Sequence, residues 1–530
     1  MSYIIEQKIK GRIYLYEVES YWDKEKKQPR QRRKYLGPKE RKYKQRKNNP
    51  EGVTSEEGLV QRKSMNVVSR SYGAIFLIKF LFKNLGIEDL VKREFPDYWR
   101  EVLSLSAYFV CEGRASYLFP HWQEEHHMDD VRRLHSSDLS VLYEYLGREE
   151  EKRWNFLSLW GKHLSPREGI YYDITSISSY GLDIELVQWG YNRDKESLPQ
   201  INLGLTHCKK SGLPVSYQVY PGSLVDVSTL KNMIKVLNLF QLRDLFFILD
   251  RGFCSVSNVK EMLRNDLKFI QPLSFLQDMS KKILKKHASQ IVHHANAFIY
   301  KSDILYHARE EVDLGGYCLS AHVIYNEKAA LAKKNNLYQG ILAVEAKIKA
   351  TPQSTLQECQ DYIENHIPKC YKKFFRIEGE NRIVVDQENL EEAVFRAGAL
   401  IFLVHGQSLT PSELIESYRN RDAIEKDMDT LKNELDTHRM RAHSDHTVNG
   451  RLFIKFLSLI IKTHIRNVTK NHEKLHHESI PEILAELKKL KINSWNGSKP
   501  FLAEPSKKQK IIFKAFGIDI QETYNTLNGY

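Results

Sequence analysis

Three strand-like segments, one helical segment and a fully apolar strand follow one another between residues 170 and 249, and this order constrains the fold more than any other feature. Residues 170–176, 200–206 and 214–220 alternate with the two-residue period of a strand. A helical pattern starting at Asp226 follows. Leu245–Leu249 is then an unbroken apolar run, typical of a strand buried on both faces. The order β-β-β-α-β predicts an α/β domain built on one sheet.

Three carboxylates are placed where such a fold could bring them together. Asp173 lies inside the first strand, and Asp250 directly follows the buried strand, where open α/β sheets gather ligands. Glu425 lies on a later helix. Burying a bare carboxylate costs several kcal/mol, so Asp173 must be paired or metal-bound. Singly, Asp173 is also explained as a strand-edge residue and Asp250 as a helix cap.

Converging carboxylates would hold hard divalent cations through oxygen ligands, usually Mg²⁺, with Mn²⁺ as a substitute. Two such ions about 3.5–4 Å apart activate a water or hydroxyl and stabilise the leaving oxygen in phosphodiester displacement. If Asp173, Asp250 and Glu425 converge, they could support such two-ion chemistry, and the set of three is harder to explain structurally than each carboxylate alone.

The helix that carries Glu425 has a strong start signal. Thr410-Pro411-Ser412-Glu413 forms a capping box with proline at the first helical position. We expect an unbroken helix to about Asp436, with an apolar stripe facing the core. At 100° per residue, four further side chains of this helix would lie within one 60° arc beside the apolar stripe: Tyr418, Arg421, Glu425 and Lys432. Because Arg421 and Glu425 are an i,i+4 pair, the arc is also explained as a salt-bridged surface face.

Positive charge is concentrated near the beginning of the chain. The formal net charge is +13 over 530 residues, and the 25 residues from Asp23 to Lys47 hold thirteen Lys/Arg and three Asp/Glu. Such a run binds phosphates with a steep salt dependence, or is a solvated linker. A strand at Arg12–Trp22 and a turn at Lys10-Gly11 predict a small β-meander. Its cations would form a DNA-binding platform: Arg30, Arg32, Arg33 and Lys34.

Other classes of protein fit poorly. The first twenty residues lack a hydrophobic signal-peptide region, and the apolar stretch Leu452–Ile461 is too short to span a bilayer. The six cysteines show no CxxC spacing, which disfavours a zinc knuckle or a disulfide framework. We therefore expect a cytoplasmic protein with no membrane partner.

Several motifs resemble one known family. Tyr418, Arg421, Glu425 and Lys432 reproduce the Y-(2)-R-(3)-E-(6)-K signature of bacterial insertion-sequence transposases of the IS4 superfamily. Four further segments resemble the same group in order and spacing: YYDITSISSYG (171–181), GYNRDKESLPQINLGL (190–205), YPGSLVDVSTL (220–230) and LDRGFCSVSN (249–258). The opening WDKEKKQPRQRRKYLG (22–37) resembles the IS1634-like branch.

This resemblance implies a DDE transposase with an RNase H-like core, interrupted between the second aspartate and the glutamate by a mixed α/β insertion. Asp173, Asp250 and Glu425 would be the catalytic metal ligands. Tyr418, Arg421 and Lys432 would contact the DNA backbone, a positioning role. The family's loop after the first strand holds three auxiliary residues, for which a structural salt bridge is an equal alternative: Arg193, Asp194 and Lys195.

The expected organisation has six parts. They are a basic β-rich DNA-binding region and linker (1–63), a helical domain (64–166), the first part of the core (167–258), the insertion (259–397), the second part of the core with the signature helix (398–470) and a C-terminal helical region (471–530).

The predicted reaction is Mg²⁺-dependent cleavage at insertion-sequence ends, followed by strand transfer into target DNA. The DNA partners would be the terminal inverted repeats and the target, and pairing two ends implies a homodimer on DNA. One alternative is a DNA-binding protein that no longer cuts, a repressor or domesticated transposase. Another is a plain RNase H-like nuclease, which leaves the basic N-terminal arm and the signature helix unexplained. The complete carboxylate set favours the active transposase.

Overall fold

The computed structural model describes residues 2–9, 12–23, 28–38, 67–128, 131–181, 184–242, 244–274, 278–379, 381–495 and 499–529. The chain divides into two compact units, Met1–Ser64 and Met65–Tyr530.

The N-terminal unit contains the expected meander. Strand β1 (Ser2–Ile9) pairs antiparallel with β2 (Arg12–Asp23), and β2 pairs antiparallel with β3 (Gln28–Pro38). All four predicted cationic residues belong to β3, where Arg33 is opposite Val18 and Arg30 is opposite Tyr21. The turn residues Lys10 and Gly11 lie outside the described residues.

The larger unit is mixed α/β, as predicted. Within the described residues its main sheet has ten strands. The order is β10 (Ala297–Tyr300), β11 (Asp303–Asp313), β12 (Cys318–Tyr325), β15 (Ala399–His405), β9, β8, β5, β6 and β7, with β16 (Arg439–Met440) beside β5. The three predicted strands are β5 (Ile170–Ser179), β6 (Gln200–Cys208) and β7 (Pro214–Pro221), and they run antiparallel. On the other side of β5, β8 (Phe246–Ile248) and then β9 (Lys268–Pro272) continue the sheet in parallel.

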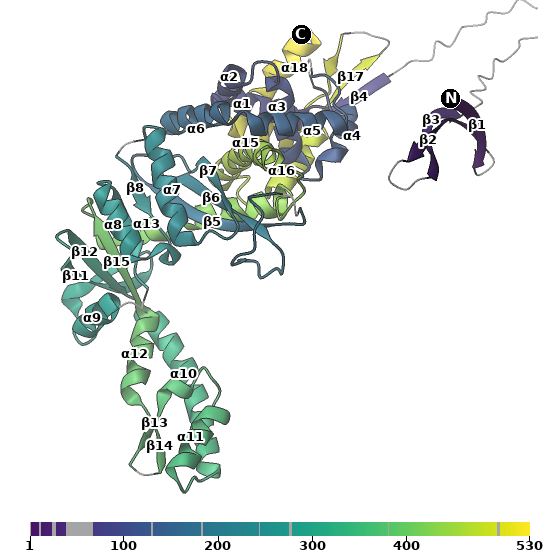
Figure 1. The fold of residues 1–530 in the computed structure, drawn as a ribbon. Helices are drawn as coiled ribbons and strands as arrows, with labels where there is room; N and C mark the ends of the chain where they lie inside the picture. Colours follow the sequence, from purple (N-terminus) through teal and green to yellow (C-terminus); the bar gives the residue numbers. More distant parts are fainter. Residues whose placement is uncertain are drawn as a thin grey trace, which may run out of the picture. The chain divides into compact units, whose positions relative to one another are not determined.

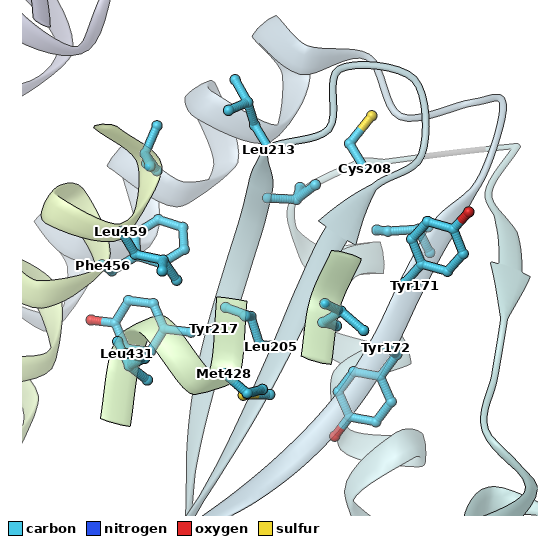
Figure 2. Close-up of a cluster of buried hydrophobic side chains, with 14 of the residues drawn as sticks. Tyr171, Tyr172, Leu205, Cys208, Leu213, Tyr217, Met428, Leu431, Phe456 and Leu459 are labelled. Atoms are coloured by element: carbon cyan, nitrogen blue, oxygen red, sulfur yellow. The ribbon is translucent and has the colours of Figure 1, made fainter. Parts of the chain in front are cut away.

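Helices cover both faces of these central strands. On one face, α7 (Asp226–Leu239) follows β7, and the hydroxyl of Tyr220 donates to the carbonyl of Thr229 at 3.1 Å. On the other, Tyr217 of β7 packs against Phe456 of α15 (Asp445–Lys470) with ring centroids 5.0 Å apart. Figure 2 shows Leu431 and the other apolar side chains that fill the space between sheet and helices. Because both faces are covered, every position of β5 is buried except Asp173, which is half-buried.

The signature helix is not continuous, so that prediction is wrong. The capping box starts α13 (Pro411–Arg419) as expected, but a second helix, α14 (Asp422–Asp429), follows after a break, and a π-helical turn, η5 (Thr430–Glu434), ends the segment. At the break the backbone closes three-residue hydrogen bonds, from Arg421 to Tyr418 at 3.2 Å and from Ile424 to Arg421 at 3.0 Å. This turn is tighter than an α-helical one, so arithmetic at 100° per residue does not carry across it. The predicted apolar stripe is nevertheless buried: Leu414, Ile424, Met428, Leu431 and Leu435.

The segment between β9 and α13 extends the sheet (Figure 1). It also adds a separate small core. The expected mixed composition is present, in the following elements: α9 (Asp278–His287), β10 (Ala297–Tyr300), β11 (Asp303–Asp313), β12 (Cys318–Tyr325), α10 (Glu327–Ala350), α11 (Leu356–Asn365), η4 (Lys372–Phe374), β13 (Phe375–Glu378), β14 (Arg382–Val385), α12 (Gln387–Gly398) and β15 (Ala399–His405). The predicted boundary at residue 258 falls inside α8 (Val256–Arg264), which leads into β9 of the same sheet. The division into domains stays a prediction.

Helices dominate the rest of the larger unit. They are α1 (Gly73–Asn84), α2 (Ile87–Glu94), α3 (Trp99–Cys111), η1 (Ser116–Leu118), α4 (Phe119–Glu125), α5 (Ser136–Arg148), α6 (Glu150–Leu164), α16 (Ile480–Lys488), α17 (Lys507–Ala515) and α18 (Ile520–Asn528). The purely helical description of the two flanking regions needs a correction, because β17 (Lys491–Trp495) pairs with β18 (Phe501–Leu502) and with β4 (Val67–Ser71). In the described ranges no helix combines the length and apolar character that crossing a bilayer requires.

Candidate active site

Asp173 is held on an interior strand of the sheet, β5. It lies opposite Leu205 of β6, and its Oδ1 accepts a hydrogen bond from the amide of Ile174 at 2.8 Å. Its side chain keeps 21% of its exposure. The strand therefore presents one polar group at an otherwise buried position.

Asp250 is positioned by the neighbouring strand. It follows β8 and precedes a short 3-10 turn, η2 (Arg251–Phe253). The buried side chain of Gln271 on β9 donates to the carbonyl of Asp250 at 3.0 Å. This bond fixes the backbone from which the Asp250 carboxylate reaches towards β5.

Arg421 brings the three predicted carboxylates together. Its Nη1 lies 3.5 Å from Oδ2 of Asp173, its Nη2 lies 3.4 Å from Oδ1 of Asp250, and the same Nη2 pairs with Oε1 of Glu425. The Arg421 side chain is only 14% exposed, whereas the Glu425 side chain is 50% exposed. The break between α13 and α14 places Arg421 directly before α14, and from this position it meets all three carboxylates.

The electrostatics of this cluster favour a cation. Burial raises the pKa of Asp173 to about 6; its bond from the Ile174 amide and the Arg421 charge oppose that rise, and the Asp250 charge adds to it. Three carboxylates around one guanidinium leave a surplus of negative charge. The cluster therefore has the composition of a site for positively charged ligands.

Tyr418 completes one wall of the cluster. Its ring contacts Phe402 of β15 edge-on at 5.0 Å, and the Arg421 guanidinium lies 6.0 Å from its centroid. Burial raises the pKa of the Tyr418 hydroxyl, and the Asp250 charge adds to the rise. The phenol is thus a neutral hydrogen-bonding group beside the carboxylates.

Lys432 contacts the predicted auxiliary loop rather than the carboxylates of Asp173, Asp250 and Glu425. Lys432 Nζ contacts both carboxylate oxygens of Asp194, at 2.9 and 2.6 Å, and its side chain is 12% exposed. Arg193 donates to Ser176 Oγ of β5 at 3.3 Å, so it lies near the Asp173 strand. Lys195 is exposed and adopts a left-handed backbone with φ 58°. Asp194 therefore forms a salt bridge, as the alternative explanation of this loop expects. The cations of β3 belong to the other unit.

Sequence reasoning missed one residue that positions the helix carrying Glu425. Asp427, two residues after Glu425, is fully buried and bonds to three partners. Its Oδ2 lies 2.6 Å from His207 Nδ1 on β6, while its Oδ1 accepts from Thr463 Oγ1 at 2.7 Å and pairs with Arg466 of α15. This network ties α14 to the sheet and to α15. The signal was present, because Asp427 falls on the apolar side of the helix, between Ile424 and Leu431.

The donor set suits a hard divalent ion. Carboxylate oxygens are the protein ligands that Mg²⁺ and Mn²⁺ prefer. Among the residues that the structure describes, no group of three or more His, Cys, Asp or Glu side chains is arranged as metal ligands. The three carboxylates form ion pairs with Arg421 instead. The chemistry of the donor atoms therefore fits a divalent ion, whereas their spacing in this structure does not.

Comparison with known proteins identifies the family. The sequence model of the transposase DDE domain matches residues 165–461. No curated protein matches the chain. Among solved structures it is similar to a piggyBac transposase synaptic complex with hairpin DNA, determined by cryo-EM, at 13% identity over 76% of this chain and 69% of that one. The TM-score of 0.33 is too low to establish a shared fold. The family match spans more than half of the chain and includes Asp173, Asp250 and Glu425, and the chain therefore belongs to the DDE-domain transposases.

Proposed function

We propose that this transposase uses Asp173, Asp250 and Glu425 to hold Mg²⁺, cuts DNA at the 3′ ends of an insertion sequence and joins those ends to target DNA. The observation that carries the proposal is their convergence on Arg421 from β5, the end of β8 and α14. DDE transposases use divalent metal ions, generally Mg²⁺. Bound at these carboxylates, two ions would activate the attacking oxygen and stabilise the leaving one.

The remaining site residues would bind and orient the DNA. Arg421 presents a guanidinium that matches a phosphate bidentately, so we propose that it exchanges carboxylates for the DNA backbone when the carboxylates take up metal. Tyr418 would donate its hydroxyl to a phosphate from the same side. Lys432 reaches a phosphate only by leaving Asp194, and that pair orders the loop against η5 until DNA binds.

We also propose an RNase H-like core. The strand order β7-β6-β5-β8-β9, with β6 antiparallel to both neighbours and β8 and β9 parallel to β5, supports it. Membership of the IS1634-like branch of the IS4 superfamily rests on the segment 22–37 and the signature spacing.

The N-terminal unit would recognise the terminal repeats through β3, whose cations are Arg30, Arg32, Arg33 and Lys34. Because the reaction must pair two ends, we propose a homodimer on DNA, acting in the bacterial cytoplasm.

The decisive experiment maps strand breaks at nucleotide resolution on a plasmid that carries the native flanks of the gene, with purified protein and Mg²⁺. We expect breaks at the outer 3′ edges of inverted repeats, absent in Glu425→Gln. The matched control is Glu416→Gln, which changes an exposed glutamate of α13 and should cut normally. Equal cutting by both variants would refute the assignment.

The second candidate function is a DNA-binding protein that does not cut. The ion pairs between Arg421 and the carboxylates favour it, since they offset part of the negative charge of the cluster without a metal. Specific binding to the repeats without breaks, in either Mg²⁺ or Mn²⁺, would establish this alternative.

A further inference from the structure

A groove on the segment inserted between β9 and α13 has no role in the site described above. It lies between α10, α12 and residues 369–374, with a volume of about 850 Å³. Its floor is apolar and well packed, with Leu337 and Phe374 buried in the insertion's own small core. A Cβ added at Gly340 of α10 would lie 2.1 Å from the Tyr371 hydroxyl oxygen, so the helix and the opposite wall approach closely. The α10 wall therefore packs directly against the Tyr371 side chain.

The polar lining of the groove is strongly cationic. Five positively charged residues contribute to it: Arg251, Lys333, Lys369, Lys373 and Arg396. Glu392 is the one acidic residue that lines it within the described chain, and it already pairs with Arg396.

The three lysines of the groove have no carboxylate partner in the described ranges, unlike many other lysines of this protein. Lys333, Lys369 and Lys373 are exposed, and no carboxylate in the described ranges forms an ion pair with them. Like charges gathered in a concave surface repel one another, and low-dielectric walls concentrate their field outwards. An anion in the groove would relieve that repulsion.

One lining residue connects the groove to the carboxylate cluster along the chain. Arg251 lines the groove and directly follows Asp250, and Ala399 and Leu400 at the start of β15 line it as well. A single small anion would not meet cations spread over two helices and a loop. A polyanion with regularly spaced phosphates would, because successive phosphates of one DNA strand advance about 3.4 Å along the axis.

We propose that this groove binds the phosphate backbone of the DNA that leads away from the cleaved bond. The proposal rests on the proposed function, because it takes the DNA at the carboxylate cluster as its starting point. Arg251 would contact the phosphate closest to the cluster, and Lys333, Lys369 and Lys373 would contact those further along. Such contacts position the duplex without reading its sequence.

The test removes the three unpaired lysines together in Lys333→Gln/Lys369→Gln/Lys373→Gln and measures Kd for a duplex carrying one element end and its flank at several salt concentrations. If each lysine neutralises one phosphate, the slope of log K against log salt becomes shallower by about 2.7. Over a fourfold rise in salt, the wild-type protein would then lose about 40-fold more affinity than the variant.

The matched control is Lys507→Gln/Lys510→Gln/Lys514→Gln on α17, which makes the same change in charge away from the groove. We expect the control to keep the wild-type slope. A wild-type slope in the groove variant would overturn the proposal, and so would an equal loss of slope in both variants. Circular dichroism spectra establish that the compared variants are folded.

Cleavage by the wild-type protein, measured in parallel, separates the two proposals. If the wild type cuts at the repeats and the groove variant keeps its slope, only the groove proposal fails. If the wild type binds without cutting and the slope falls in the groove variant, only the cleavage proposal fails.

Discussion

Replacing Asp427 with asparagine should loosen the helix that carries Glu425. The Asp427 carboxylate has no exposure and is bonded to His207, Thr463 and Arg466. Asparagine keeps the shape of the side chain but removes its charge. Its NH2 group, a hydrogen-bond donor, would also replace an acceptor oxygen that now faces Arg466 or His207. Breaking a buried ion pair from one side costs about 3–5 kcal/mol. The Arg466 side chain keeps 21% exposure and can recover some hydration. We therefore take the cost of Asp427→Asn as about 3 kcal/mol, the lower end of this range.

Hydrogen exchange followed by mass spectrometry measures this loss locally, which suits a chain too large for a two-state analysis. A cost of about 3 kcal/mol corresponds to roughly 150-fold faster exchange of the α14 amides. The control is Asp422→Asn on the same helix, where an exposed carboxylate pairs with Lys426 and contributes below about 1 kcal/mol. Equal exchange of α14 in the two variants would refute the reasoning.

Three further predictions concern the wider structure. Burial lowers the pKa of Lys455 from 10.5 to about 7, so between pH 7 and 10 the unfolded chain binds a proton that the folded chain does not, and stability should rise with pH. The apparent Tm of Lys455→Met should climb less steeply over this range than that of the wild type, and parallel curves would contradict the shift. Gly450 of α15 lies so close to α5 that an added Cβ would be 2.0 Å from the Tyr143 carbonyl oxygen; Gly450→Ala should therefore cost at least about 1–3 kcal/mol, and an unchanged Tm would argue against this contact. Arg421→Gln leaves the carboxylates without their cation, so it should lower Tm in metal-free buffer and gain more Tm from added Mg²⁺ than the wild type does; an equal gain would count against a shared site.

Much of the local structure was readable from the sequence. The alternation in residues 170–176, 200–206 and 214–220 predicts three strands that the structure contains, because a two-residue apolar period fits only a pleated strand with buried faces. The capping box at Thr410 likewise starts a helix where predicted, because its hydrogen bonds are all local.

The break at Asn420–Arg421 could not be read in the same way. No proline or glycine interrupts that segment, so propensity and periodicity both predict one helix. The turn closes because α14 is tied elsewhere, through Asp427, to β6 and α15. Partners 220 and 39 residues away decide it, and no local pattern contains them.

The candidate site, too, could be predicted from the sequence only in part. Residue type and position single out Asp173 and Asp250, since carboxylates on or beside apolar strands must find a positive partner. The signature spacing adds Glu425. That Arg421 is this partner in the described structure, while Lys432 pairs with Asp194, follows only from the tertiary arrangement. The sequence by itself determined which residues carry charge and which segments form strands, because those depend on neighbours in the chain. The tertiary structure decided which charges meet, because β5, β8 and α14 come together only when the sheet and its covering helices bury their apolar faces.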